Sequence, residues 1–205
     1  RGVGLPRCPT GALEEVGVPL LKGTDPLRRM RLLERLAKRI PDKPSARAAV
    51  DIALHDLLGK VTGQPLWRLL GGYRDRIVTS VTIGITSVND TVERAKAFVS
   101  QGFRAIKIKS GKNLDEDVEK ILRVREVVGE RTALRCDANQ GYSVPDALEF
   151  VRRTRSARIE ILEQPTPREK PDMLGRVVAG TPIPVMADES LMSLRDAFSL
   201  ARREL

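Results

Sequence analysis

Two lysines, Lys107 and Lys109, alternate with isoleucines in the segment Ala-Ile-Lys-Ile-Lys at residues 105–109. A strand places alternate residues on opposite faces, so both lysines share one face and both isoleucines share the other. If the apolar face packs under helices, the ammonium groups point into the interior, where burial and mutual repulsion lower their pKa. A lysine with a lowered pKa can act as a base. The alternative is a solvated edge strand with both lysines in water.

Each of the next three strand-like segments ends in a carboxylate. These acids are Asp137 in Cys-Asp-Ala-Asn, Glu163 in Leu-Glu-Gln-Pro and Asp188 in Ala-Asp-Glu-Ser, each about one strand–helix unit after the last. The carboxyl ends of neighbouring parallel strands meet at the mouth of a barrel, where barrel active sites lie. Three carboxylates with room for water or substrate oxygens suit Mg²⁺ better than zinc. Any one acid alone could instead pair with an arginine; the ordered set favours a magnesium site.

Lysines beside a carboxylate-bound magnesium ion indicate one chemistry, the removal of a proton next to a carboxylate. The cation would bind the carboxylate of a small-molecule substrate, and Lys109 would take the proton from the adjacent carbon. The metal would then stabilise the enediolate that forms. Lys107, on the same face, would lower the pKa of Lys109 and hydrogen-bond the developing enediolate oxygen.

Alternating strands and helices, starting near residue 77, must position these side chains. We expect strands at residues 77–84, 105–109, 133–138, 159–163 and 184–188, each followed by a helix, with Asn113, Ser143 and Ser193 as three of the helix caps. Five strands cannot close a barrel of eight. An open doubly wound sheet is the alternative, but Gly84-Ile85-Thr86 lacks the glycine-rich phosphate turn. The sequence therefore predicts an α/β fold, a partial (β/α) barrel of about five units.

The residues before this alternation show a helical pattern. Apolar side chains recur at helical spacing over residues 24–40 and again from about Ser45 to Lys60, where Ile52 and Leu57 fall on one side. His55, the single histidine, lies within the second helix without other metal-type ligands nearby and is assigned no site. We expect residues 1–76 and residues 77–205 to form separate domains, with the catalytic side chains in the second.

Composition excludes several function classes. The net charge is +9, but basic residues are spread over several predicted helices and aromatic residues make up only 3% of the chain, which argues against nucleic-acid binding. No apolar run reaches the roughly 20 residues that span a bilayer, and the first residues lack a signal-peptide core. The expectation is a cytoplasmic protein with no membrane partner.

Four motifs together resemble the muconate-lactonizing branch of the enolase superfamily, whose sites use a lysine base with magnesium. They are Lys107-Ile108-Lys109, Asp137-Ala138-Asn139-Gln140, Glu163-Gln164-Pro165 and Ala187-Asp188-Glu189-Ser190. Residues 49–72 resemble the helix and connector that lead from the family's α+β capping domain into its barrel. Residues 81–85 are most similar to dipeptide epimerases of the L-Ala-D/L-Glu type.

This resemblance implies roles for the candidate residues. Asp137, Glu163 and Asp188 would bind Mg²⁺, Lys109 would be one acid/base catalyst and Lys107 its helper, in the epimerisation of a dipeptide such as L-Ala-L/D-Glu. Residues 1–76 would be the helical part of the capping domain. Against the family, the chain is expected to be truncated at both ends, with the second catalytic lysine beyond Leu205. Alone it would then be inactive. A homo-oligomer and a partner that completes the barrel both remain open.

Two other functions remain open on the sequence. A muconate cycloisomerase or an o-succinylbenzoate synthase of the same superfamily would share the acids and the lysine pair. A non-catalytic homologue or a basic binding module is the second alternative. A decaying enzyme has no reason to keep three acids and two lysines in order, so the catalytic interpretation is preferred.

Overall fold

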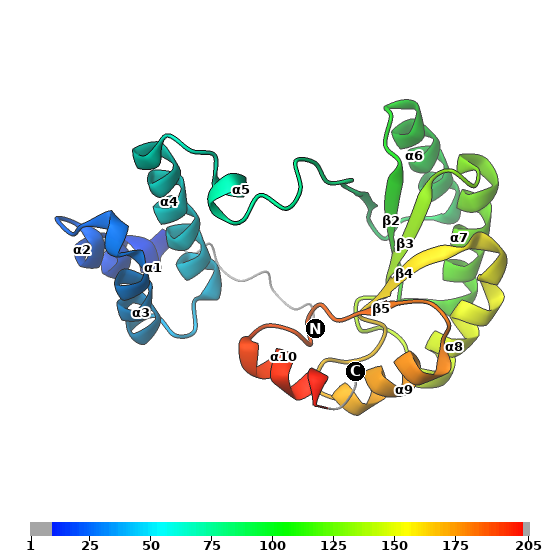
Figure 1. The fold of residues 1–205 in the computed structure, drawn as a ribbon. Coiled ribbons are helices and arrows are strands. Elements are labelled where there is room, and N and C mark those ends of the chain that lie inside the picture. Colours follow the sequence, from blue (N-terminus) through cyan, green and yellow to red (C-terminus); the bar gives the residue numbers. More distant parts are fainter. Residues whose placement is uncertain (1–9, 203–205) are drawn as a thin grey trace. The chain divides into compact units, whose positions relative to one another are not determined.

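The computed structural model describes residues 10–202 and divides the chain into two compact units (Figure 1). The first unit ends at Ile77 and the second starts at Val78. Within residues 10–202, every helix is too short or too polar to span a lipid bilayer.

The first unit is helical in the part that the structure describes. It contains α1 (Thr10–Ala12), the π-helical turn η1 (Leu13–Gly17), α2 (Val18–Leu21), the 3₁₀ turn η2 (Pro26–Arg28), α3 (Arg29–Arg39), α4 (Pro44–Thr62) and α5 (Leu66–Leu69). Its core forms where α3 contacts α4. The buried side chains there are Leu32, Leu36, Ile40, Ala46, Val50 and Leu54.

The prediction of which face of α4 is buried is wrong. Ile52 is 69% exposed and Leu57 is 41% exposed, while Val50 and Leu54 face the core. Apolar residues lie on several sides of this helix, so their spacing alone does not select one face. The side that is buried is the one that α3 covers.

The second unit is an α/β structure built on a parallel five-stranded sheet in the order β1-β2-β3-β4-β5. The strands are β1 (Val81–Ile83), β2 (Ala105–Lys109), β3 (Ala133–Asp137), β4 (Ile159–Glu163) and β5 (Val185–Met186). The helices that follow them are α6 (Val88–Ser100), α7 (Leu114–Val128), α8 (Val144–Arg153), α9 (Pro171–Gly180) and α10 (Leu194–Ala201), with a 3₁₀ turn, η3 (Arg155–Ala157), before β4. Five successive βα units confirm the predicted partial barrel (Figure 1).

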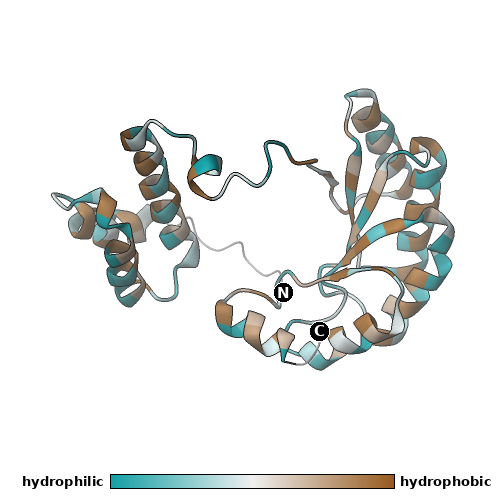
Figure 2. Ribbon diagram, viewed as in Figure 1, coloured by the Kyte–Doolittle hydropathy of each residue, from teal (hydrophilic) through white to brown (hydrophobic). Residues whose placement is uncertain are grey.

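The period-two pattern of β2 works as the sequence predicts. Ile106 and Ile108 are fully buried in the core between sheet and helices, whereas the side chains of Lys107 and Lys109 are 21% and 30% exposed on the opposite face. Hydrophobic and hydrophilic bands alternate along the central strands in Figure 2. The sheet therefore presents both lysines on the face away from helices α6 and α7.

The two outer strands are shorter than expected. β1 covers only Val81–Ile83 of the predicted 77–84, and Ile77 and Val78 are 80% and 62% exposed. β5 covers only Val185–Met186 of the predicted 184–188. Each outer strand pairs with a single neighbour, so fewer ladder hydrogen bonds fix its ends. As a result, Asp188 lies in the loop beyond β5 and not on the strand.

Helix caps fix where the helices start. Ser143 and Asp146 form a reciprocal capping box at α8, and Ser193 accepts a hydrogen bond from the Asp196 N–H at α10. The Asn113 side chain does the same for the Glu116 N–H at α7. All three predicted caps are confirmed, so each of these helices begins a short distance after the preceding strand.

Candidate functional site

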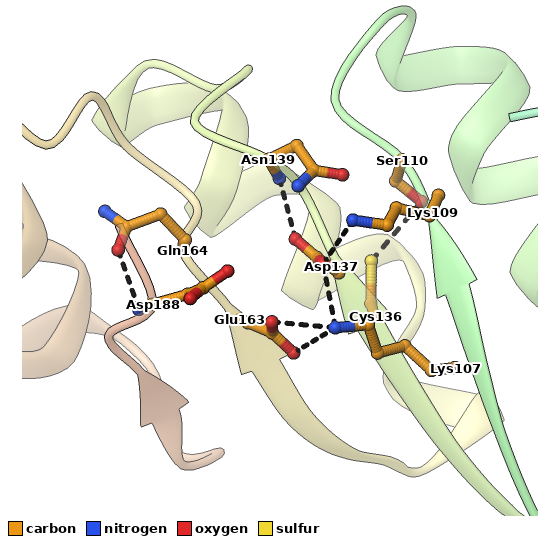
Figure 3. Close-up of polar contacts among 9 residues, drawn as sticks. All are labelled: Lys107, Lys109, Ser110, Cys136, Asp137, Asn139, Glu163, Gln164 and Asp188. Atoms are coloured by element: carbon orange, nitrogen blue, oxygen red, sulfur yellow. Dashed lines mark hydrogen bonds and ion pairs between the residues drawn. The ribbon is translucent and has the colours of Figure 1, made fainter. Parts of the chain in front are cut away.

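The two lysines of β2 reach the acids at the ends of β3 and β4 (Figure 3). Lys107 Nζ donates to Glu163 Oε1 and Oε2 at 2.7 and 2.8 Å, and it lies 2.9 Å from Asp137 Oδ2. Lys109 Nζ donates to the same Asp137 Oδ2 at 2.9 Å. Four of the five sequence-predicted site residues thus form one contact network.

Strand register explains why these four side chains meet. Lys109 is the register partner of Asp137 in the β2–β3 pair, and Asp137 is the partner of Glu163 in the β3–β4 pair. Adjacent strands lie roughly 4.8 Å apart, so these side chains form one row across the sheet. The carboxylate of Asp137 is fully buried and that of Glu163 is 8% exposed.

Asp188 lies beside this network without joining it. No hydrogen bond or ion pair involves its carboxylate among residues 10–202, but its charge is near enough to raise the pKa of Glu163. Its backbone N–H donates to the side-chain oxygen of Gln164 at 2.9 Å. Figure 3 shows its side chain extending from the loop after β5 toward Glu163. The structure therefore brings the third acid to the site's edge.

The expected lowering of the lysine pKa is wrong for Lys107. Burial works against its charge, but hydrogen bonds to Glu163 and Asp137 and the negative charges of both acids outweigh burial, so the pKa of Lys107 is raised above 10.5. On the sequence, burial and the neighbouring lysine predict a lowered pKa, and the acids within 3 Å of the ammonium group reverse that direction. In this arrangement Lys107 is a stable cation.

The two acids of the network have opposite shifts. Burial raises the pKa of Glu163, and the charges of Asp137 and Asp188 add to that effect against the Lys107 hydrogen bond. Burial also acts on Asp137, but hydrogen bonds from Lys109, Lys107 and the Asn139 N–H outweigh it and lower its pKa. The negative charge of Glu163, which burial and the neighbouring acids disfavour, would be stabilised by an added cation.

The donor chemistry fits a hard divalent cation. Asp137, Glu163 and Asp188 supply oxygen ligands only, as Mg²⁺ prefers, and no sulfur or imidazole lies among them. Within residues 10–202, no three acids, histidines or cysteines are arranged as a formed metal site. Here the lysine ammonium groups occupy the contact positions of Asp137 and Glu163.

The loops after β2 and β3 interlock through two glycines that the sequence reasoning missed. A Cβ on Gly111 would lie 1.9 Å from the Ala138 carbonyl oxygen, and a Cβ on Gly141 would lie 2.0 Å from the Gly111 carbonyl oxygen. The Gly111 N–H and the Tyr142 hydroxyl both donate to the buried Asp117, at 2.8 and 3.0 Å. Close backbone contact is the reason for glycine at both positions. The packing fixes the segments just beyond Lys109 and Asp137.

Two protein families match the chain. The family described as "Enolase C-terminal domain-like" matches residues 90–205, more than half of the chain. The family described as "Mandelate racemase / muconate lactonizing enzyme, N-terminal domain" matches residues 4–71.

Similar proteins are epimerases. An L-Lys-D/L-Arg epimerase from Desulforapulum autotrophicum is 41% identical over 179 residues, which cover 87% of this chain and 50% of that protein. The structure of a dipeptide epimerase from Enterococcus faecalis V583, complexed with Mg and the dipeptide L-Leu-L-Tyr, has a TM-score of 0.91 at 34% identity over 95% of this chain and 56% of that one. A substrate-liganded L-Ala-D/L-Glu epimerase from Bacillus subtilis has a TM-score of 0.90 at 33% identity, over 95% and 55%. The chain thus spans about half the length of the relatives that it matches.

Proposed function

The chain belongs to the mandelate racemase/muconate lactonizing enzyme family of the enolase superfamily, and on this premise we propose that the whole protein epimerises dipeptides. The reaction class is magnesium-dependent proton transfer at the carbon next to a carboxylate, through an enediolate intermediate. The observation that carries the proposal is the row of Lys109, Asp137 and Glu163 across three strands, with Lys107 bridging the two acids.

In this proposal the three acids hold the cation. Asp137 and Glu163, at the ends of β3 and β4, and Asp188, in the loop after β5, would be its ligands. When bound, Mg²⁺ would supply positive charge that offsets the negative charge building on the substrate carboxylate. The same charge would draw the acids away from the lysines, and Lys107 and Lys109 would then be available to the substrate.

The lysines do the proton chemistry. Lys109, next to the end of β2, would remove the substrate α-proton, and Lys107 would donate a hydrogen bond to the oxygen that gains charge. A base must lose its own proton first, so Lys109 has to leave the ion pair with Asp137 before it can act. Epimerisation also needs a proton returned to the opposite face, which a second acid/base group of the whole protein would supply.

Similarity supports a dipeptide as the substrate class. The relatives' names include L-Ala-D/L-Glu, L-Lys-D/L-Arg and hydrophobic dipeptide epimerases, so the sequence-based preference for Ala-Glu is one member of this class. We propose a dipeptide with a free carboxylate as substrate, handled in the cytoplasm.

The proposal is tested by α-proton exchange. The full-length protein is incubated in D₂O with Mg²⁺ and L-Ala-L-Glu, L-Lys-L-Arg or L-Leu-L-Tyr, and deuterium incorporation is followed by mass spectrometry. Incorporation into at least one dipeptide is expected, and it should stop when EDTA removes the metal. No incorporation into any dipeptide, together with turnover of muconate or of the succinylbenzoate precursor, would favour the cycloisomerase or synthase alternative.

A second measurement separates loss of metal from loss of fold. Mg²⁺ should raise the melting temperature of the wild-type protein, and Glu163→Gln should remove most of that rise. The matched control is Glu160→Gln on the same strand, because the Glu160 side chain pairs with Arg135 outside this network. Equal magnesium responses of both variants would exclude Glu163 as a ligand.

A further inference from the structure

Gln164 makes more hydrogen bonds near the site than its position in the sequence suggests. Its side chain is fully buried, and all four of its hydrogen-bonding positions are used. Nε2 donates to the Thr166 carbonyl oxygen at 2.9 Å and to Ser190 Oγ at 2.7 Å. Oε1 accepts from the backbone N–H groups of Asp188 and Ser190 at 2.9 and 3.0 Å. The amide thus joins the end of β4 to the loop after β5.

The sheet ladder stops just before this loop. The Gln164 N–H donates to the Met186 carbonyl oxygen at 2.8 Å, and the strand β5 ends at Met186. Beyond that point the Gln164 side chain, and not a neighbouring strand, accepts the hydrogen bond of Asp188. The backbone at Asp188 is therefore held to β4 by one side chain (Figure 3).

The backbone of Gln164 is in an unfavourable conformation that this amide helps to retain. Its φ is 34°, in the left-handed region that residues other than glycine seldom adopt. Such strain persists only where surrounding contacts fix it. Besides the side-chain bonds, the Gln164 carbonyl oxygen accepts from the Gln140 N–H at 2.8 Å. Loops after three successive strands meet at this residue.

Asp188 differs from the other two acids in how it is held. Hydrogen bonds from Lys109 and the Asn139 N–H fix the carboxylate of Asp137, and hydrogen bonds from Lys107 fix that of Glu163. Within residues 10–202, the carboxylate of Asp188 has no such contact. Its place is set through its backbone.

We propose that Gln164 is a positioning residue that places the Asp188 carboxylate beside Glu163. The inference rests on the proposed function in one respect, that Asp188 serves as a metal ligand. Supporting groups of this kind typically change metal affinity about 10- to 100-fold when they are removed. Methionine has nearly the same length as glutamine and no amide, so Gln164→Met removes the four bonds and keeps most of the volume.

The first measurement needs no metal. Amide hydrogen exchange of the full-length protein is compared between wild type, Gln164→Met and the control Gln140→Met. Gln140 lies in the adjacent loop and its side chain accepts one hydrogen bond, from the Arg168 N–H, with none to residues 188–190. Exchange at Asp188 and Ser190 should speed up at least about tenfold in Gln164→Met only, because their acceptor is gone. Unchanged protection there would overturn the inference.

The second measurement is magnesium affinity, read by calorimetry and not by activity. Gln164→Met should weaken Mg²⁺ binding about tenfold or more, whereas Gln140→Met should stay within about twofold of wild type. In an Asp188→Ala background the same Gln164→Met change should have less than about a twofold further effect, because its target is gone. Additive losses would mean that Gln164 does not act through Asp188, and that result overturns the inference.

The two measurements separate this inference from the proposed function. If the wild-type protein binds no Mg²⁺, the proposed function fails, and the exchange data alone decide whether Gln164 fixes Asp188. If wild type binds Mg²⁺ and Gln164→Met binds it equally well, the positioning role fails and the proposed function stands. Should Gln164→Met unfold, Gln164→Asn keeps an amide but shortens the side chain, which withdraws the acceptor from the Asp188 N–H, so exchange there should still speed up at least about tenfold. Exchange in Gln164→Asn that stays at the wild-type rate would overturn the inference.

Discussion

Lys107 Nζ contacts both carboxylate oxygens of Glu163, at 2.7 and 2.8 Å, across the intervening strand β3. The contact joins β2 to β4, which are not hydrogen-bonded neighbours. Because Asp137 lies between them at 2.9 Å from the same ammonium group, one lysine forms ion pairs with acids from two strands. This cation and a divalent metal ion would compete for the same oxygens.

Lys107→Met should separate stability from metal binding. Removing the ammonium group leaves two buried acids with less positive charge, so without Mg²⁺ we expect a loss of about 1.5–3 kcal/mol in the free energy of unfolding. With Mg²⁺ the variant should gain more stability than wild type, because no lysine competes. Denaturant titrations with and without Mg²⁺ measure the loss of stability and the gain on adding the metal. Lys112→Met, at an exposed lysine, is the control.

The contribution of Lys107 to the stability of the fold should fall only at high pH. The pKa of Lys107 is raised above 10.5 because hydrogen bonds and the charges of both acids outweigh burial. Its stabilisation is therefore fully present below about pH 10 and is lost as pH rises through the raised value. The stability difference between wild type and Lys107→Met should be flat from pH 7 to 10. A difference that shrinks near pH 8 would contradict the raised pKa.

Lys109→Arg should abolish proton transfer while preserving the fold. Arginine keeps the positive charge beside Asp137 but does not deprotonate at working pH, so it cannot act as a base. We expect α-proton exchange of the full-length protein to fall about 10²- to 10⁴-fold, with a melting temperature near that of wild type. Retained exchange would show that Lys109 is not the base.

Gly111→Ala should lower the free energy of unfolding far more than Gly102→Ala does, because Gly102 has a similar φ but open space around it. Gly111 has φ +97° and its added Cβ meets the Ala138 carbonyl oxygen, whereas Gly102 has φ +92° and nothing within 4 Å. Left-handed strain alone costs about 1–2 kcal/mol, which is the expectation for Gly102→Ala. Gly111→Ala adds a backbone clash and should lose about 3 kcal/mol or more. Urea denaturation of both variants tests this, and equal losses would exclude the interlock.

Cys136 should resist thiol reagents until the protein unfolds. Its side chain is fully buried, and burial raises the pKa of its thiol to about 12. Since the thiolate is the reactive form, labelling at pH 8 should be negligible in the folded state and fast in denaturant. The measurement uses a Cys8→Ser background so that a single thiol reports. Rapid labelling of the folded protein would contradict the burial of β3.

Much of the second unit follows from local patterns. The bounds of β2 and β4 and the start of α7 after its cap Asn113 are those that the sequence predicts, because residue alternation and capping agree there. The sequence predicts longer outer strands than the structure contains, because hydrogen-bonded pairing, and not residue type, sets the ends of these strands. The buried face of α4 and the pKa of Lys107 depend on which groups lie opposite in space, and no spacing in the chain encodes that. In the sequence Gln164 stands out only as part of the Glu-Gln-Pro motif, because its contacts are with a loop 24 residues away.

The in-register row of Lys109, Asp137 and Glu163 has a consequence for how such a protein can diverge. The distances between these groups are set by backbone hydrogen bonds inside the sheet, so insertions and deletions in the loops farther along each unit leave them in place. Under the proposed function, natural variation could change the loops around the substrate while the reacting groups keep their separation. Heritable changes in substrate preference would then accumulate in the loops, and changes on the row would be removed by selection.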